Sequence, residues 1–157
     1  MKNILFTCLG LAIAGLVLVG CKVEDPFVDR VVSPVLVDIV GAPFGAPFAT
    51  EPTVSYPIAG KVVLKARILE LDKTHLLDYT KGIDSIPVGN VAMRLTFRNG
   101  APLGEATTDA QGYVTFEKSW SELGLADPKN GNLVRVSWTG THKGVTFTRL
   151  SQVRASQ

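Results

Sequence analysis

The sequence predicts an all-β protein: a single seven-stranded Greek-key β-sandwich that follows a signal peptide and a proline-rich extended tether. Three observations predict it. Residues 91–98 alternate apolar and polar side chains with a period of two, as in a strand with one buried face. Turn-forming residues such as Asn99-Gly100 and Gly112 recur roughly every dozen residues. Helical patterning is confined to one short signal at residues 119–122.

Seven segments carry the pattern expected of strands: residues 35–40, 61–71, 91–98, 101–108, 113–118, 133–139 and 145–153. Val134, Val136 and Trp138 alternate with polar neighbours, so we expect all three on the buried face of their strand. Asn99-Gly100 predicts a type I′ hairpin turn, because both central residues of that turn need a positive φ. Short strands joined by turns at this spacing are typical of a sandwich.

The helical signal lies between two predicted strands. Ser119 and Glu122 have the spacing of a capping box, in which a hydroxyl and a carboxylate bind each other's backbone amides. Gly124 follows soon afterwards, and glycine is a poor helix former. We therefore expect a single turn here rather than a helix.

The N-terminus has the order of an export signal. Lys2 supplies a positive charge, and an apolar run follows over residues 4–19. That run is shorter than the roughly 20 residues needed to span a bilayer. Residues 18–21 (LVGC) resemble the lipobox of bacterial lipoproteins. The resemblance implies that residues 1–20 are removed and that Cys21 is acylated, which anchors the mature protein to a membrane.

The residues around Cys21 bear on the destination. Lys22 stands where enteric lipoproteins kept in the inner membrane usually have aspartate, so we expect the bacterial outer membrane, facing the periplasm or the cell surface. Residues 22–25 (KVED) also resemble the surface-export signals of Bacteroidetes lipoproteins. The alternative is an ordinary secretory signal that happens to precede a cysteine. Because Cys8 lies in the signal, the mature chain has no disulfide, and its core must hold the fold.

Residues 21–57 form the predicted tether. Six of the nine prolines lie there, and proline disfavours both a helix and a long central strand. The tetrapeptide Gly-Ala-Pro-Phe occurs twice in succession over residues 41–48. Residues 35–40 are apolar enough to add an edge strand, and the sequence leaves open whether they do. The sandwich is predicted to occupy residues 58–157.

Three blocks of the sequence share the motifs of one family. Residues 58–62 (IAGKV), 87–95 (PVGNVAMRL) and 108–116 (TDAQGYVTF) resemble the successive motifs of the transthyretin-like, carboxypeptidase-regulatory-like domains of bacterial envelope proteins, which are Ig-like sandwiches. In the third block, we expect Asp109 to cap a turn and Gly112 to take a positive φ. The resemblance implies an accessory or interaction module without catalytic residues. An insert at residues 71–86 departs from the family pattern.

The sequence offers no metal site, cofactor motif or catalytic constellation. His75 and His142 lack partners at metal-ligand spacing, and no nucleophile motif such as G-x-S-x-G is present. The net charge of +2 is spread along the chain without a basic run, which argues against nucleic acid as a partner. We therefore expect a protein that is not an enzyme and needs no cofactor.

Three residues are candidate ligand contacts: Trp120, Tyr79 and His75. Trp120 is a candidate because the flat apolar face of an indole can stack on a sugar ring. The alternative for Trp120 is a place in the core, which is what we expect for Trp138. Tyr79 and His75 lie in the insert.

The pattern as a whole favours a membrane-anchored, non-catalytic protein-interaction module of the cell envelope. In this hypothesis, a sheet edge or the insert contacts a partner protein, because edges and irregular loops are where such domains recruit partners. Two alternatives remain open. One is a cell-surface glycan-binding protein that uses Trp120, and the other is an anchor subunit of an envelope or secretion assembly.

Overall fold

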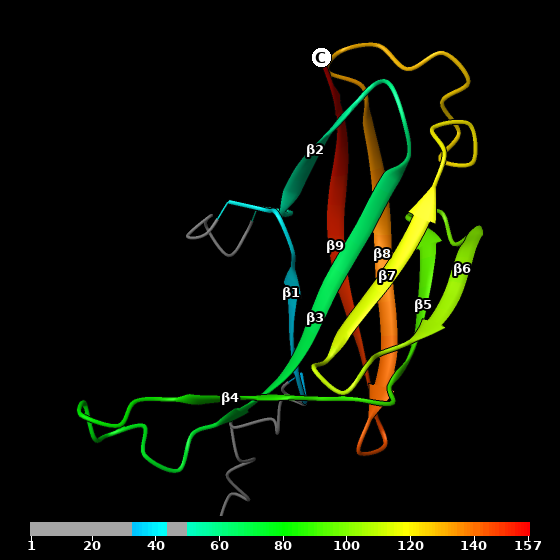
Figure 1. Ribbon diagram of the computed structural model, residues 1–157. Coiled ribbons are helices and arrows are strands. Elements are labelled where there is room, and N and C mark those ends of the chain that lie inside the picture. Colours follow the sequence, from blue (N-terminus) through cyan, green and yellow to red (C-terminus); the bar gives the residue numbers. More distant parts are fainter. Residues whose placement is uncertain (1–32, 44–49) are drawn as a thin grey trace, which may run out of the picture. The chain divides into compact units, whose positions relative to one another are not determined.

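The computed structural model describes residues 33–43 and 50–157, and their regular elements are all strands (Figure 1). The strands are β1 (Leu36–Ile39), β2 (Thr53–Pro57), β3 (Val62–Asp72), β4 (Asp84–Pro87), β5 (Ala92–Phe97), β6 (Pro102–Thr107), β7 (Tyr113–Lys118), β8 (Leu133–His142) and β9 (Val145–Ser156). The all-β prediction is confirmed. Among the described residues, no helix is long and apolar enough to cross a membrane. The predicted signal peptide and Cys21 lie outside the described residues.

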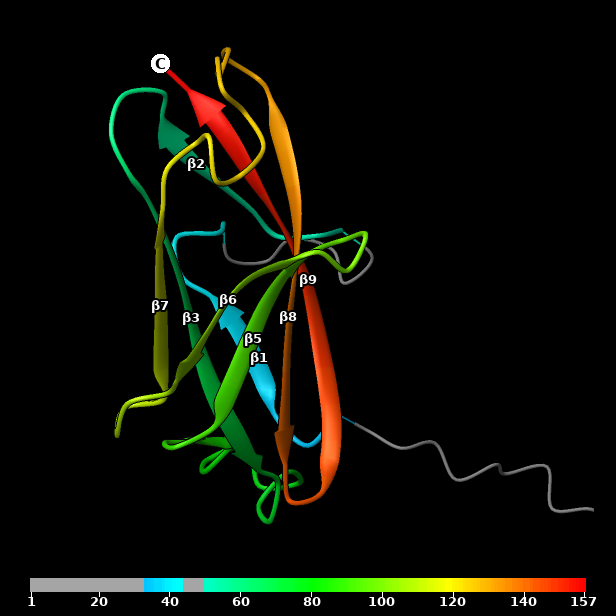
Figure 2. The same cartoon turned by 90° about the vertical axis from the view of Figure 1, so that its right-hand side faces the viewer.

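The strands form two sheets, which Figure 2 shows as separate layers. β3 is the centre of the four-stranded sheet. Ala66 of β3 pairs with both β1 and β7, and Leu69 pairs with both β1 and β4. β1 therefore lies on one side of β3, while β7 and β4 follow each other along the opposite side. The five-stranded sheet has the order β2-β9-β8-β5-β6.

The predicted seven-strand Greek-key pattern is not confirmed. The described residues form nine strands, of which β2 and β4 were not expected, and β2 pairs parallel with β9. β2 lies in the segment whose proline content predicted a tether. It is an edge strand and Pro57 is its last residue. An edge strand tolerates proline because a missing ladder hydrogen bond matters least there.

The sandwich begins before residue 58. β1 pairs with β3 over Leu36–Ile39, so the candidate edge strand at residues 35–40 does join a sheet. Val37 and Ile39 of β1 are buried, as is Val54 of β2. The segment predicted as a tether thus contributes one strand to each sheet and apolar side chains to the core.

Trp138 of β8 lies in the core with 1% of its surface exposed, as predicted. Its indole N–H donates a hydrogen bond to Ser151 Oγ of β9 at 2.9 Å. Its ring meets the ring of Phe116 edge-on, with 5.7 Å between the centroids. Phe116 belongs to β7 in the other sheet, so this aromatic contact joins the two layers. Val134 and Val136 are buried beside it, also as predicted.

The type I′ turn is not where the sequence predicted it. At Asn99-Gly100 only the glycine has a positive φ, of 91°, and the Gly100 N–H donates to Phe97 O at 2.9 Å. This is a three-residue loop with a glycine bulge, not a two-residue loop. Lys143 and Gly144, between β8 and β9, both have a positive φ and form the two-residue turn instead.

Two predicted turns are confirmed. Asp109 Oδ1 accepts the backbone N–H of Tyr113 at 2.9 Å, and Gly112 has a φ of 78°. Ser119 Oγ accepts the Glu122 N–H at 3.3 Å while Glu122 Oε2 accepts the Ser119 N–H at 2.8 Å. This reciprocal pair is the capping box, and it closes a turn without a following helix.

Candidate functional site: an exposed apolar arm

Residues 69–87 form an extension of the four-stranded sheet, which we call the arm. It consists of the last residues of β3, a loop over residues 73–83, and β4, and Figure 1 shows it reaching away from the sandwich. The side chains of Leu77 and Tyr79 are 99% and 97% exposed, and that of Leu76 is 57% exposed. Large apolar side chains gathered on one exposed loop are typical of an interaction surface.

Two hydrogen-bonded turns give the arm loop its shape. Asp72 Oδ1 accepts the backbone N–H of Thr74 at 2.9 Å and its hydroxyl at 2.5 Å. Asp78 Oδ1 accepts the same two groups of Thr80, at 3.0 and 2.5 Å. These hydrogen bonds, from the hydroxyls first, hold the pKa of both carboxyls below the ordinary value. The two aspartates thus stabilise turns within the arm loop, as the side chains of Asp-x-Thr sequences commonly do.

The base of the arm is attached to the other sheet through Glu70. Its Oε1 accepts a hydrogen bond from Lys143 Nζ at 2.5 Å, and its Oε2 lies 3.3 Å from His142 Nε2. The hydrogen bond from Lys143, followed by that from His142, holds the pKa of the Glu70 carboxyl below its ordinary value. Because His142 ends β8 and Lys143 lies in the turn after it, this cluster joins the arm to the five-stranded sheet.

The structure separates the three candidate ligand residues. Tyr79 and His75 are both exposed on the arm loop. Trp120 lies in the core with 4% of its surface exposed, and its indole N–H donates to Pro57 O at 3.0 Å. Of the two interpretations that the sequence left open for Trp120, the core position is the one observed. An indole covered in this way has no free face on which a sugar ring can stack.

The sequence analysis named the insert at residues 71–86 but did not single out Leu76 and Leu77. A signal was present, because two adjacent leucines in a polar segment fit neither strand alternation nor a helical stripe. Such a pair has no obvious place in the core. The exposure of both side chains in the structure shows that they do not reach it.

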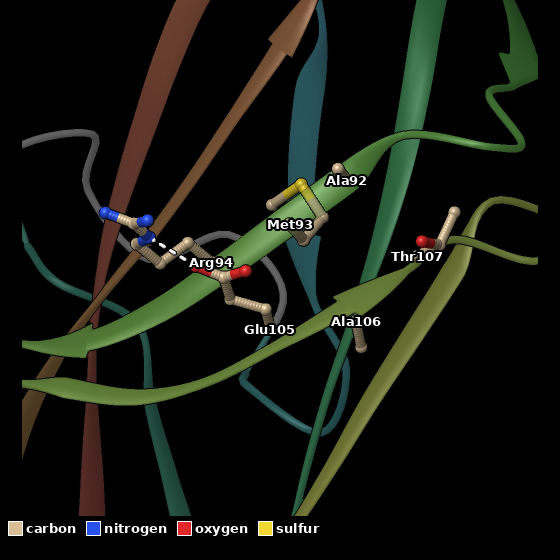
Figure 3. A pocket seen from close by; sticks show the side chains of 6 residues that line it. All are labelled: Ala92, Met93, Arg94, Glu105, Ala106 and Thr107. Carbon is tan, nitrogen blue, oxygen red and sulfur yellow. Dashed lines mark hydrogen bonds and ion pairs between the residues drawn. The ribbon is translucent and has the colours of Figure 1, made fainter.

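A hollow away from the arm lies between β5 and β6 (Figure 3). Its volume is about 400 Å³, and it is lined by Ala92, Met93, Arg94, Glu105, Ala106 and Thr107. Arg94 Nε and Glu105 Oε1 form an ion pair at 2.8 Å, so the two charges in the hollow neutralise each other. The remaining lining side chains supply no group suited to acid–base or nucleophilic chemistry, so this hollow is a weaker candidate than the arm.

The described residues contain no group of three or more histidine, cysteine, aspartate or glutamate side chains arranged to hold a metal ion. Cys21, the predicted lipidation site, lies outside the described residues, and its role stays a prediction.

The chain matches no known protein family, and no characterised protein shows significant sequence similarity to it. The resemblance of the three sequence blocks to transthyretin-like domains therefore remains a hypothesis.

Proposed function

We propose that this protein is a lipid-anchored, non-catalytic interaction module of the bacterial envelope, in which the arm binds a partner protein. The observation that carries the proposal is the nearly complete exposure of Leu77 and Tyr79 on a projecting loop. Burial of one such side chain in a partner contributes about 1.5–3 kcal/mol. Tyrosine is also enriched among the residues that dominate binding at protein interfaces.

The geometry of the arm suits insertion into a groove. The Asp72–Thr74 and Asp78–Thr80 hydrogen bonds order the loop before a partner arrives. A preordered loop loses less conformational entropy on binding, and more of the contact energy is left to appear as affinity. The loop also lies beyond the paired part of the sandwich, so a partner can surround it without disturbing the sheets.

The anchor in this proposal is Cys21. Its support is the order of Lys2, the apolar run over residues 4–19 and the LVGC sequence that ends at Cys21. In the proposal the lipid holds the module at the outer membrane, and the arm recruits the partner there. Mass spectrometry of the mature N-terminus tests this part directly, since an acylated Cys21 must be its first residue.

A cell-surface glycan is a weaker ligand for this fold. The glycan hypothesis rested mainly on Trp120, whose ring is covered in the core. The arm offers Tyr79 alone as an aromatic platform among the three candidate ligand residues.

The experiment is co-purification from mildly solubilised membranes with the full-length protein, its Leu77→Ser variant and its Leu133→Ser variant. Leu133 of β8 is the matched control, because it is an exposed leucine outside the arm. We expect Leu77→Ser to lose a stoichiometric partner that Leu133→Ser retains. Equal recovery of the same proteins with both variants would rule out the arm as the binding surface.

A further inference from the structure

Two cations on the outer face of the four-stranded sheet share one aromatic ring. Lys65 and Arg67 alternate along β3 with fully buried residues such as Ala66, so both lie on the outer face. β7 lies beside β3, and Tyr113 of β7 is the pairing partner of Arg67 (Figure 1). Lys65 Nζ lies 4.1 Å and Arg67 Cζ 5.1 Å from the centre of the Tyr113 ring. We call these three residues the basic patch, in which the electron-rich face of the ring attracts both charges.

A hydrogen-bonded turn fixes the basic patch in place. The Tyr113 N–H donates to Asp109 Oδ1 at 2.9 Å, and the Asp109 N–H donates to Tyr113 O at 2.8 Å. Gln111 belongs to the same turn, and its carbonyl oxygen accepts a hydrogen bond from Arg67 Nε at 3.2 Å. One turn therefore positions both the aromatic ring and the guanidinium. A site that is ordered before binding loses less conformational entropy when a ligand arrives.

The basic patch has no paired counter-charge in the described part of the chain. Five other cations do form ion pairs with carboxylates: Lys61, Arg94, Arg98, Lys118 and Lys143. Asp38 of β1 stands opposite Arg67 in the ladder, but the two side chains form no ion pair. The Lys65 ammonium, the terminal nitrogens of Arg67 and the Tyr113 hydroxyl donate no hydrogen bond to another described residue. All three side chains are partly exposed, so an anion from outside can reach them.

The donors of the basic patch match a phosphate monoester. Such a group carries a charge of about −1.5 to −2 near pH 7 and three strong acceptor oxygens. Arg67 presents a planar fork of N–H donors, Lys65 a compact charge, and Tyr113 a single O–H. Asp38 opposes the two cations with one negative charge only, which leaves the site positive. A carboxylate ligand has one charge and two oxygens, so it would leave part of the patch unmatched.

We propose that the basic patch binds a phosphate monoester on the outer face of the four-stranded sheet. This inference goes beyond the proposed function, because none of the three residues belongs to the arm. A lipid headgroup that ends in a phosphate and a soluble phosphorylated molecule both supply this chemistry. The two sources differ in whether the phosphate is held at a membrane.

The test is a titration of the full-length protein with inorganic phosphate, in uncharged detergent micelles near pH 7 and at constant ionic strength. Binding is followed by NMR through the backbone amides of residues 67 and 113. The variants are Lys65→Gln and Arg67→Gln, which each remove one charge of the patch, and Asp38→Asn, which removes the opposing charge. The matched control is Arg135→Gln, because Arg135 is an exposed arginine of β8 in the other sheet.

We expect saturable binding that weakens about tenfold or more in Lys65→Gln and Arg67→Gln, because each variant loses a charged hydrogen-bond donor. Arg135→Gln should stay within about twofold of the parent, since salt screens a distant charge. Asp38→Asn should bind about twofold more tightly, because it removes a nearby repulsion. A gain in affinity cannot come from a loss of folding, so this variant decides the question even if a patch variant unfolds. Shifts that do not saturate, or equal weakening by Arg135→Gln, would overturn the proposal.

Nanodiscs that hold the protein through its proposed lipid separate the two sources of phosphate. The titration is repeated in phosphatidylcholine nanodiscs that contain either phosphatidic acid, a phosphate monoester, or phosphatidylglycerol, an anionic diester. If the ligand is a headgroup, phosphatidic acid occupies the patch, and inorganic phosphate then binds about threefold or more weakly than with phosphatidylglycerol. Equal affinity in the two nanodiscs assigns the patch to a soluble phosphorylated molecule.

Discussion

Glu70 Oε1 on β3 lies 2.5 Å from Lys143 Nζ in the turn between β8 and β9. The contact crosses from one sheet to the other at the base of the arm. The second oxygen of the same carboxylate lies 3.3 Å from His142. This cluster is therefore a side-chain link between the base of the arm and the five-stranded sheet.

Glu70→Gln should loosen the arm with little effect on global stability. The amide keeps the size of the side chain but loses the charge that attracts Lys143, and partly exposed ion pairs contribute little to the free energy of unfolding. We expect faster amide hydrogen exchange in residues 73–83 at an almost unchanged Tm. The matched control is Glu117→Gln, whose partner Lys61 lies away from the arm. Unchanged exchange in Glu70→Gln would mean that this cluster does not orient the arm.

The turn after β7 makes the fold sensitive to acid. The Ser119 N–H, donating to the carboxylate, is the main cause that lowers the pKa of Glu122 from 4.5 to about 2. Between these two values the unfolded chain binds a proton that the folded chain does not, so folding is favoured less as the pH falls. The contribution of Glu122 is complete above a pH of about 4.5 and is lost as the pH approaches 2. In thermal unfolding from pH 7 to pH 2, Glu122→Gln should show a shallower fall in Tm than the parent. An equal fall in Tm with pH in the variant and the parent would contradict the assignment of this acid sensitivity to Glu122.

Ser151→Ala should destabilise the core by about 1–3 kcal/mol, because it leaves the buried Trp138 N–H without its acceptor. The matched control is Ser137→Ala, since Ser137 is on β8 next to Trp138 and is only partly buried. The free energy of unfolding of Ser137→Ala should stay within about 0.5 kcal/mol of the parent value. Urea unfolding of the two variants measures both free energies. Similar losses in the two would show that the Trp138–Ser151 hydrogen bond adds little.

Gly112 and Gly124 allow the cost of backbone strain to be measured apart from the cost of steric crowding. Gly112 and Gly124 have similar φ values, +78° and +80°, so alanine at either position costs about 1–2 kcal/mol in backbone strain. At Gly112 the added Cβ would also lie 2.5 Å from the carbonyl oxygen of Ile68, whereas nothing lies within 4 Å at Gly124. We expect Gly112→Ala to be less stable than Gly124→Ala by about 1–3 kcal/mol in urea unfolding. Equal stabilities would mean that β3 shifts freely to make room.

The sequence by itself determined those features whose cause is local. Val134, Val136 and Trp138 alternate with polar residues, and a strand buries every second side chain whatever its neighbours are. The Asp109 and Ser119 turns follow from side chains that bind amides within four residues of themselves. These features need no information from distant parts of the chain.

Only the tertiary structure decided the features whose cause is remote. β2 became a strand because Thr53 pairs with Gln152, about a hundred positions later, and such a partner leaves no mark on a local pattern. Trp120 is covered by the core cluster, and its N–H finds an acceptor in Pro57 O, which a sequence window around the tryptophan does not contain. Leu76 and Leu77 are exposed because no other element among the described residues covers the arm loop. Burial is a property of what packs against a residue, so hydrophobicity alone left Trp120 open between the core and the surface and did not single out the exposed leucines.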